Sequence, residues 1–421
     1  MRVYNISYSD VSGGASRAAF RLHRSLLDSG IESRMLVRVR KSDDPFVSGP
    51  VRRSGKLYAY MLGYADSLPL RMQLKPGALP HSAAWTGGLA AAHINGLADG
   101  VVNLHWIGNG TLSIEAIGRL NKPVVWTLHD MWPFCGAEHY AAEDGIERWR
   151  SGYSRQNRPE GDRGVDMDRL VWFRKKNAWK QPFHLVCPSN WMARKAGESA
   201  LMKDWPITVV PNPLDTGVFK PLSRQAARKV FNLPEDAKLV LFGSSAVLGN
   251  SLKGWDLLQK ALHLVASEDA TIEGVVFGHS RPVNAAASGL KIHWLGRLHD
   301  NVSLALLYSA ADVVVVPSRV DNLPQVGTEA QACGCPVVAF DTGGLADVVE
   351  HTASGYLAQP FEPRDLAKGI AWVTQSRERQ RELSASARKR ALMLWAPEVV
   401  ARQYMGVYRR ACESFAMRKR Q

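Results

Sequence analysis

Carboxylates, glycines and an expected helix start follow one another closely between residues 312 and 360. One apolar run leads into a polar loop that carries Asp321, and a helix expected from Gln325 carries Glu329. A second apolar run ends at Asp341 and is followed by two glycines. If both runs are parallel strands, these groups lie outside the carboxyl ends of the sheet, where open α/β sheets bind ligands. A helix N-terminus there favours an anion, so the chemistry indicated is the binding of a pyrophosphate.

Three shorter motifs place groups of a similar kind at other strand ends. Gly13 and Gly14 separate the first apolar run from a helical stretch, so the backbone there can approach a phosphate or an acceptor. His129 follows another apolar run, and Lys253 comes after a run that ends at Gly243. A glycine turn before a helix is common, and an isolated histidine is more often structural than catalytic. These motifs therefore carry weight only in combination.

The elements that must position these residues alternate between two patterns. Short runs that are apolar at nearly every position, and rich in valine, predict strands buried on both faces of a parallel sheet. Amphipathic stretches of helical length lie between them, as at 15–29, 255–266 and 302–310. The alternation predicts βαβ units and an α/β fold. The expected strands are at residues 3–9, 101–107, 123–128, 183–187, 207–211, 239–243, 274–278, 291–296, 312–317 and 335–340.

The expected strands fall into two groups, which indicates two domains. The segment 211–224 between the groups contains three prolines and few core positions, so it is the predicted linker. We predict a first domain at 1–213, a second at 214–395, and a C-terminal helix at 396–421. Pro397 should break the helical pattern before it. The last helix then either lies on the surface as an ordinary helix or crosses back to the first domain.

Composition limits the classes of function. The chain has 421 residues, 46% of them hydrophobic and 22% charged, so it can bury a sizeable core and is not disordered throughout. Its net charge of +14 favours an anionic partner, but the cations are scattered and no nucleic-acid-binding motif interleaves them. Five cysteines are too few and too irregular for a disulfide framework, which favours a reducing compartment. No signal peptide or spanning helix is expected, so we predict a cytoplasmic protein whose only membrane contact would be peripheral.

The segment 312–360 resembles the donor-binding signature of retaining GT-B glycosyltransferases of family 4 (group 1). The matching residues are Asp321 and Glu329, with seven residues between them, then Ala330, Cys333 to Ala339, Gly343-Gly344 and Gly355 to Leu357. Further matches at Ser12 to Ala15, Thr127 to Trp132 and Gly243 to Gly254 extend the resemblance over most of the chain. The resemblance implies two Rossmann-like domains that face each other across a cleft. The first would bind the acceptor, and the second would bind the nucleotide sugar.

The resemblance also implies roles for single residues of the second domain. Glu329 would grip the ribose hydroxyls, and Asp321, where the family usually has glutamate, would face the hydroxyls of the donor sugar. Lys253 would neutralise the leaving diphosphate. Ser244 stands where the family has an arginine for the same task, and Arg297 is a candidate substitute. The backbone of Asn322, Leu323, Pro324 and Gln325 would hold sugar and phosphate. In the first domain, Gly13 and Gly14 are further donor-binding positions, where the backbone would approach a phosphate.

In the first domain, the resemblance implies that His129 contacts the donor sugar near the reacting centre. We therefore predict His129, Asp321 and Lys253 as the catalytic residues. Asp166 and Asp168 have the Asp-x-Asp spacing with which other glycosyltransferases hold a metal, but they lie in a basic helical stretch rather than at a strand end. Two pairs fail to complete a zinc spacing, Cys135 with His139 and Cys333 with Cys335. No metal or other cofactor is expected.

The acceptor side is less defined by the sequence. Residues 129–140 resemble the acceptor-side loop of exopolysaccharide members, which implies transfer to a hydroxyl of a growing surface polysaccharide or a lipid-linked oligosaccharide. Residues 57–74 combine aromatic and apolar side chains with flanking cations, so they either rest on lipid head groups or form a buried or lid segment. Two alternatives remain. One is a sugar-nucleotide epimerase or hydrolase of the same architecture, and the other is a non-catalytic basic protein that binds membranes or nucleic acid.

Overall fold

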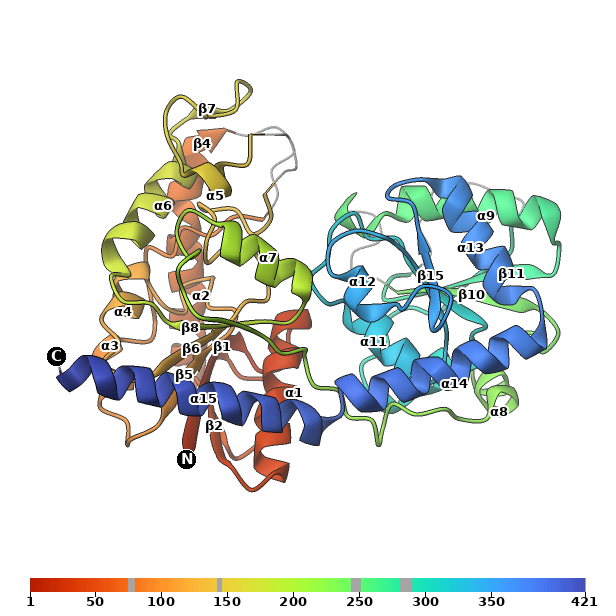
Figure 1. Ribbon diagram of the computed structural model, residues 1–421, viewed down its shortest axis with the longest axis horizontal. Coiled ribbons are helices and arrows are strands. Elements are labelled where there is room, and N and C mark those ends of the chain that lie inside the picture. The colour runs from red at the N-terminus through yellow and green to blue at the C-terminus, as the bar shows by residue number, and fades with distance from the viewer. Residues whose placement is uncertain (75–79, 142–145, 244–250, 281–289, 421) are drawn as a thin grey trace. The chain divides into compact units, whose positions relative to one another are not determined.

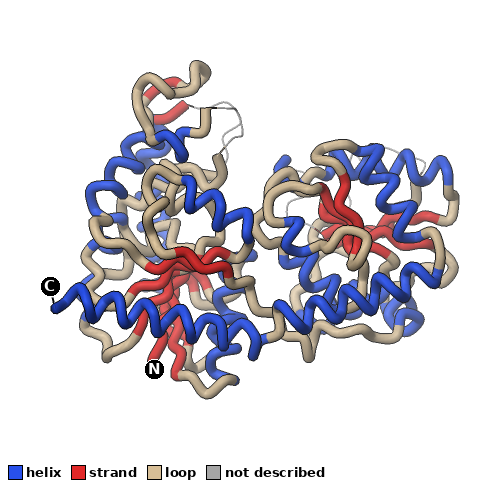
Figure 2. Tube along the Cα trace, in the orientation of Figure 1, coloured by secondary structure: helices blue, strands red, loops and turns tan. Residues whose placement is uncertain are grey.

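The computed structural model describes residues 1–420 except 75–79, 142–145, 244–250 and 281–289. These residues form two compact units (Figure 1). The first contains Met1–Pro213 and Val400–Gln421, and the second contains Leu214–Val399. Each unit has a central parallel sheet with helices on both of its faces (Figure 2). The predicted α/β class with two doubly wound parallel sheets is confirmed.

The first unit contains a parallel sheet in the order β3-β2-β1-β5-β6-β8-β9. Its strands are β1 (Arg2–Ser9), β2 (Glu32–Val39), β3 (Val47–Ser48), β5 (Val101–Leu104), β6 (Val124–Thr127), β8 (His184–Cys187) and β9 (Ile207–Val209). A separate antiparallel pair joins β4 (Gln73–Leu74) to β7 (Arg163–Gly164). The order of strands reverses between β1 and β5, where the chain leaves one half of the sheet for the other.

The helices of the first unit connect these strands. They are α1 (Gly14–Asp28), α2 (Arg53–Ser67), the short η1 (Leu68–Met72), α3 (Ala91–Asn95), α4 (Ile114–Gly118), α5 (Arg148–Ser151), α6 (Met167–Ala178), α7 (Asn190–Glu198) and α15 (Pro397–Arg420). Helix α1 shows why such stretches are helical. Its buried Ala18, Leu22 and Leu26 recur at helical spacing, so one face can pack on the sheet.

The second unit has a parallel sheet in the order β12-β11-β10-β13-β14-β15. Its strands are β10 (Lys238–Gly243), β11 (Ile272–Phe277), β12 (Ile292–Trp294), β13 (Val313–Val316), β14 (Val337–Phe340) and β15 (Gly355–Ala358). Its helices are α8 (Arg224–Val230), the short η2 (Ser251–Lys253), α9 (Trp255–Glu268), α10 (Asn301–Ala310), α11 (Gln325–Ala332), α12 (Leu345–Val348), α13 (Pro363–Thr374) and α14 (Arg377–Leu394). Here the order reverses between β10 and β13.

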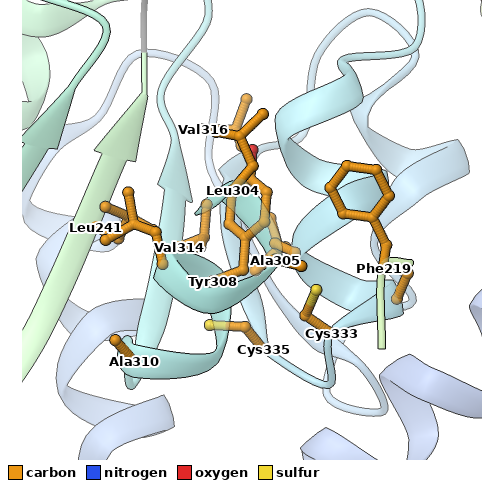
Figure 3. Packing of buried hydrophobic residues seen from close by; sticks show 14 of the residues in the cluster. Phe219, Leu241, Leu304, Ala305, Tyr308, Ala310, Val314, Val316, Cys333 and Cys335 are labelled. Atoms are coloured by element: carbon orange, nitrogen blue, oxygen red, sulfur yellow. The ribbon is translucent and has the colours of Figure 1, made fainter. Parts of the chain in front are cut away.

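Side chains of the second sheet point alternately into two apolar clusters, one on each face. In β10, Leu239 and Leu241 belong to one cluster, whereas Val240 and Phe242 belong to the other. Figure 3 shows the first cluster, in which Leu241 lies with side chains of β13 and α10. Burial on both faces explains why these strands are apolar at nearly every position.

The C-terminal helix α15 packs on the first unit. The preceding helix α14 ends at Leu394 and α15 begins at Pro397, as expected of a residue that cannot continue a helix. Apolar side chains of α15 join those of the first sheet in one buried cluster. Tyr408 Oη accepts a hydrogen bond of 3.0 Å from Asn103 of β5, and Tyr404 Oη lies 3.0 Å from Thr127 Oγ1 of β6. The helix is thereby fixed to two central strands.

The described residues include no helix that is both long and apolar enough to cross a membrane.

Candidate functional site

The second unit brings together two of the predicted donor-site residues, Lys253 and Asp321, at one end of its sheet. Lys253 follows β10 and Asp321 follows β13, the neighbouring strands between which the order reverses. Lys253 Nζ donates a hydrogen bond to Asp321 Oδ2 over 2.6 Å. Their side chains are 37% and 14% exposed, so solvent and ligands can reach both. The carboxyl ends of strands at such a reversal are where doubly wound sheets bind ligands.

Two glycines allow the loops around this ion pair to approach closely. Gly254 has a φ of 66°, and a Cβ at this position would overlap the carbonyl oxygen of Pro317. Gly343 has a φ of 59°, and a Cβ there would overlap the carbonyl oxygen of Asp321. Gly344 N donates to that same oxygen over 2.8 Å. The backbone that carries Asp321 is therefore held by a turn that only glycine fits.

Glu329 is held on helix α11 beside the same loop. Its side chain is buried, and Tyr308 of α10 donates a hydrogen bond to Glu329 Oε2 over 2.8 Å. Helix α11 begins at Gln325, so its first N–H groups lie in the segment that follows Asp321. The side chain of Asp321 in the preceding loop is also fixed, since Asn322 N donates to Asp321 Oδ1 over 3.0 Å. Two carboxylates and a helix N-terminus thus occupy oriented positions in one segment.

Arg319 is a cation near this segment that our sequence analysis missed. Its backbone N–H donates to Leu252 O over 2.8 Å, and a guanidinium N–H donates to Ser251 O over 2.7 Å. The guanidinium also pairs with Asp256 at 2.6 Å. Arg319 therefore ties η2 to the loop after β13 and positions Lys253, which ends η2. The only feature of the sequence that pointed to Arg319 was its position two residues before Asp321.

Other predicted residues have less structural context. Ser244 lies outside the described residues, so its role stays a prediction. Arg297 is exposed after β12, and its part as a substitute cation also stays a prediction. Gly13 has a φ of 86° directly before α1, and a Cβ on Gly13 or Gly14 would meet open space. A side chain at Gly13 would therefore have space, but the positive φ at this position favours glycine.

In the first unit, a buried chain of polar side chains orients His129. His129 follows β6 and stacks on His105, which follows β5, with ring centroids 5.3 Å apart. His105 Nδ1 lies 3.0 Å from His129 Nε2, and His105 Nε2 lies 3.1 Å from Asn5 Oδ1. Because Asn5 Oδ1 accepts, neutral His105 carries its proton on Nε2 and accepts at Nδ1 from the Nε2–H of His129. This assignment makes Nδ1 the basic nitrogen of His129.

Next to His129, Asp130 organises a second polar group. Asp130 Oδ2 lies 2.5 Å from His139 Nδ1 and accepts from Trp106 Nε1 over 2.9 Å. Ser82 Oγ lies 2.8 Å from His139 Nε2. Burial opposes the ionisation of Asp130, but its ion pair and hydrogen bond with His139 hold its pKa below the ordinary value. The residues lining a small pocket here are His105, Trp106, Ile107, Gly108, Trp126, His129, Asp130, Trp132, Pro133 and His139.

The pH dependence of stability should reveal the environment of His129. Burial lowers its pKa to about 4, although the charge of Asp130 acts in the opposite direction. Between about pH 6.5 and pH 4, the unfolded chain therefore binds more protons at this residue than the folded chain. The free energy of unfolding should fall by about 2 kcal/mol more in the wild type than in His129→Gln over this range. Denaturant unfolding of both proteins at several pH values measures the difference, and parallel curves would contradict the assignment.

Models of two protein families match this chain. Residues 12–218 match Glycosyltransferase Family 4, and residues 223–390 match Glycosyl transferases group 1. The first half therefore carries a domain of glycosyltransferase family 4 and the second a domain of glycosyl transferases group 1. Together with the two parallel sheets, this defines a fold of the GT-B glycosyltransferase type.

Individual relatives and solved structures agree with this class. The chain is 37% identical over 198 residues to a D-inositol 3-phosphate glycosyltransferase of Geodermatophilus obscurus. This match covers 44% of this chain and 43% of the relative. The protein of the same name from Mycolicibacterium smegmatis is 35% identical, over 50% of this chain and 49% of the relative. The chain thus spans about half the length of the curated relatives it matches. These relatives are not named as exopolysaccharide enzymes, which was the subfamily expected from residues 129–140.

The solved structures resemble the chain in fold. Sucrose-phosphate synthase from Thermosynechococcus elongatus has a TM-score of 0.64 and 18% identity, with 98% of this chain and 99% of that chain covered. HepE of Anabaena, solved with UDP and glucose, has a TM-score of 0.63 and 16% identity, with 96% and 98% covered.

Proposed function

We propose that this chain is a retaining glycosyltransferase that moves a sugar from a nucleoside diphosphate to a hydroxyl group of an acceptor. The observation that carries the proposal is the ion pair of Lys253 and Asp321 beside the start of α11, with Glu329 held on that helix. The two glycosyltransferase domains support the reaction class. The complex of HepE with UDP and glucose supports a nucleotide sugar as the donor.

The proposed chemistry relies on charge stabilisation by the chain itself. When the bond between the sugar and the diphosphate breaks, negative charge develops on the leaving diphosphate. Lys253 and the first N–H groups of α11 supply positive charge there, so they stabilise the transition state without a metal. An oxygen of the leaving phosphate takes the proton of the acceptor hydroxyl while the new bond forms on the same face, which retains the anomeric configuration. His129, neutral at pH 7, contacts the donor sugar.

Nucleotide binding is the direct test of the donor site. One of UDP, GDP, ADP and dTDP should raise the midpoint of thermal unfolding, because it binds only the folded state. Glu329→Ala should weaken that nucleotide about 10- to 100-fold, the loss expected for hydrogen bonds to a charged group. The shift caused by the nucleotide, compared within each buffer, should be the same with and without EDTA. A thermal-shift titration measures both effects.

Two variants separate binding from transfer and from folding. Tyr308→Phe removes one hydrogen bond to Glu329 but keeps the carboxylate, so nucleotide affinity should change far less than in Glu329→Ala. His129→Ala should retain the nucleotide-induced shift and mainly slow sugar transfer. If no nucleotide shifts the midpoint, or if Glu329→Ala responds as the wild type does, the assignment of the donor site is wrong. Release of free sugar or of an epimer without acceptor would instead favour the hydrolase or epimerase.

Two acceptor classes have separate support. The names of the curated relatives favour an inositol phosphate. The resemblance of residues 129–140 favours a polysaccharide or lipid-linked oligosaccharide. We propose the second class, because the first unit has an exposed apolar surface suited to a lipid-linked substrate. Transfer assays with D-inositol 3-phosphate and with polyprenyl-diphosphate sugars distinguish the two.

The exposed apolar surface lies on helix α2 and is called here the α2 surface. Its exposed members are Leu57, Tyr58, Tyr60, Met61 and Tyr64, and Tyr60 reaches 74% exposure. Arg52, Arg53 and Lys56 at the start of the helix are exposed too. Aromatic side chains beside cations suit the boundary between lipid head groups and acyl chains, with the cations near anionic phosphates. We therefore propose a peripheral contact with the cytoplasmic face of the membrane.

Vesicle sedimentation tests this contact. The protein should bind vesicles that contain phosphatidylglycerol more tightly than vesicles of phosphatidylcholine alone, and less tightly at high salt. The double variant Leu57→Ser with Tyr60→Ser should weaken binding about tenfold, since each side chain would bury apolar area in the lipid. Val302→Ser alters an exposed apolar residue of the second unit and serves as the matched control. Equal binding by the double variant and the control would rule out the α2 surface.

A further inference from the structure

Three metal-ligating side chains from distant parts of the chain meet in the first unit. His81, Glu138 and Asp168 each offer one ligand atom, and these atoms all lie within 4.8 Å of one another. His81 and Glu138 are paired by an antiparallel β-bridge, and Asp168 lies in the first turn of α6. His81 Nε2 is 3.3 Å from Asp168 Oδ1. Ligands around a tetrahedral ion with bonds of about 2.1 Å are about 3.4 Å apart, so these atoms would draw together from separations of up to 4.8 Å when the ion binds.

The two carboxylates are buried side by side. Glu138 is 8% exposed and Asp168 is 1% exposed. Placing two negative charges next to each other away from water is costly unless something positive lies between them. Glu138 Oε2 has no hydrogen-bond partner among the described residues, although the residue is more than nine-tenths buried.

Hydrogen-bond donors hold the outer oxygen of each carboxylate. Tyr153 Oη donates to Glu138 Oε1, and Gln73 Nε2 donates to Asp168 Oδ2 over 2.9 Å. Of the other two oxygens, Asp168 Oδ1 is the one that lies 3.3 Å from His81 Nε2, and Glu138 Oε2 is the one without a partner among the described residues. Ligating carboxylates are commonly oriented by hydrogen bonds of this kind from residues around the metal. The arrangement thus presents one oxygen from each acid, together with an imidazole nitrogen.

Among the described residues, Lys175 and Arg148 are two cations whose charges act on Asp168, and the hydrogen bonds given for both lead to other groups. Lys175 Nζ donates to three backbone carbonyls, Trp132 O, Cys135 O and Gly136 O, which uses all three of its N–H groups. Arg148 forms an ion pair with Asp166 at 2.6 Å. Lys175 therefore interacts with the two carboxylates of the cluster through its charge.

We propose that His81, Glu138 and Asp168 bind a divalent transition-metal ion, Zn²⁺ or Mn²⁺. One imidazole and two carboxylates suit an ion of intermediate softness, and water would complete its coordination. The ion would join three segments: the strand-like residue 81, the loop at 131–139 and helix α6. That loop also carries His139 of the pocket next to His129. We infer a structural role for the ion, separate from the diphosphate chemistry of the second unit.

Metal content and metal affinity test this site directly. The full chain, produced without a histidine tag and purified without chelators, should carry about one Zn²⁺ or Mn²⁺ by mass spectrometry. After dialysis against EDTA and removal of the chelator, titration with ZnCl2 or MnCl2 should show one binding event. The midpoint of thermal unfolding should rise as the ion is restored, because the unfolded chain lacks the assembled site.

Substitutions that remove the ligand atoms identify the ligands. Glu138→Gln and His81→Asn should each weaken binding of the ion at least tenfold, and both should lose the response of thermal unfolding to EDTA. Asp204→Asn changes an exposed carboxylate of the same unit and should behave as the wild type. If a variant fails to fold, the titration of the wild type still decides the matter. Absence of bound metal together with no binding by the wild type, or unchanged affinity in both variants, would show that the carboxylates share a proton instead.

Discussion

Replacing Lys253 by alanine is expected to lower kcat for sugar transfer about 100- to 1000-fold. Removing one preorganised group that stabilises charge in a transition state has an effect of about this size. Lys253 is held in place by η2, by the contacts of Arg319 and by the hydrogen bond of 2.6 Å to Asp321. The charge on the diphosphate increases as the bond to the sugar breaks, so the loss should be larger in kcat than in donor affinity.

Steady-state kinetics with the nucleotide sugar identified by thermal shift measures this effect. Lys260→Ala removes an exposed lysine from the neighbouring helix α9 and should leave kcat within about twofold of the wild type. Lys253→Arg retains the charge and should recover part of the activity. A Lys253→Ala variant with nearly normal kcat, in a protein that still binds the nucleotide, would exclude Lys253 from the chemical step.

The parallel sheets could be predicted from the sequence because a strand that is buried on both faces is apolar at nearly every position. The run Val313 to Val316 is buried at every position, as expected of a strand that is covered on both faces. The acidic loop and the start of α11 were also accessible to prediction, since Asp321, Glu329 and the glycine turn follow one another within one segment. Strand, loop and helix then place them together without information from the rest of the chain.

The contacts that orient these residues could not be predicted in the same way. Tyr308 reaches Glu329 from another helix, and Asn5 reaches His105 from another strand. Such pairs depend on the order and register of strands, which local patterns do not specify.

Spacing along the chain was equally uninformative for the metal-ligating cluster. The Asp-x-Asp motif brings only Asp168 to it, while Asp166 caps α6 and pairs with Arg148. The expectation of no metal was drawn from residues close together in the sequence, whereas the cluster contains residues 81, 138 and 168, which are far apart in the sequence.

The Asp312→Asn variant is expected to destabilise the second unit by about 3 to 5 kcal/mol, the usual loss when one partner of a buried ion pair is removed. Asp312 is 3% exposed and directly precedes β13. Its Oδ2 accepts from Arg228 Nη2 and from Leu239 N, both at 2.7 Å. Its Oδ1 contacts Arg224 and Arg377, the latter at 3.3 Å. Asparagine would leave these guanidinium groups without a counter-charge, and its NH2 group would face donors instead of acceptors.

Thermal and denaturant unfolding of the full chain measure the loss. For a unit of this size, the midpoint of thermal unfolding should fall on the order of 10 °C. Glu268→Gln makes the same change from carboxylate to amide on the exposed face of α9, and should shift the midpoint by less than about 1 °C. Because Arg228 also donates to the carbonyl oxygens of Ala310 and Ala237, it cannot turn outward when its counter-ion is lost. A loss below about 1 kcal/mol would mean that water reaches the arginines and that burial of the charge is not what makes Asp312 necessary.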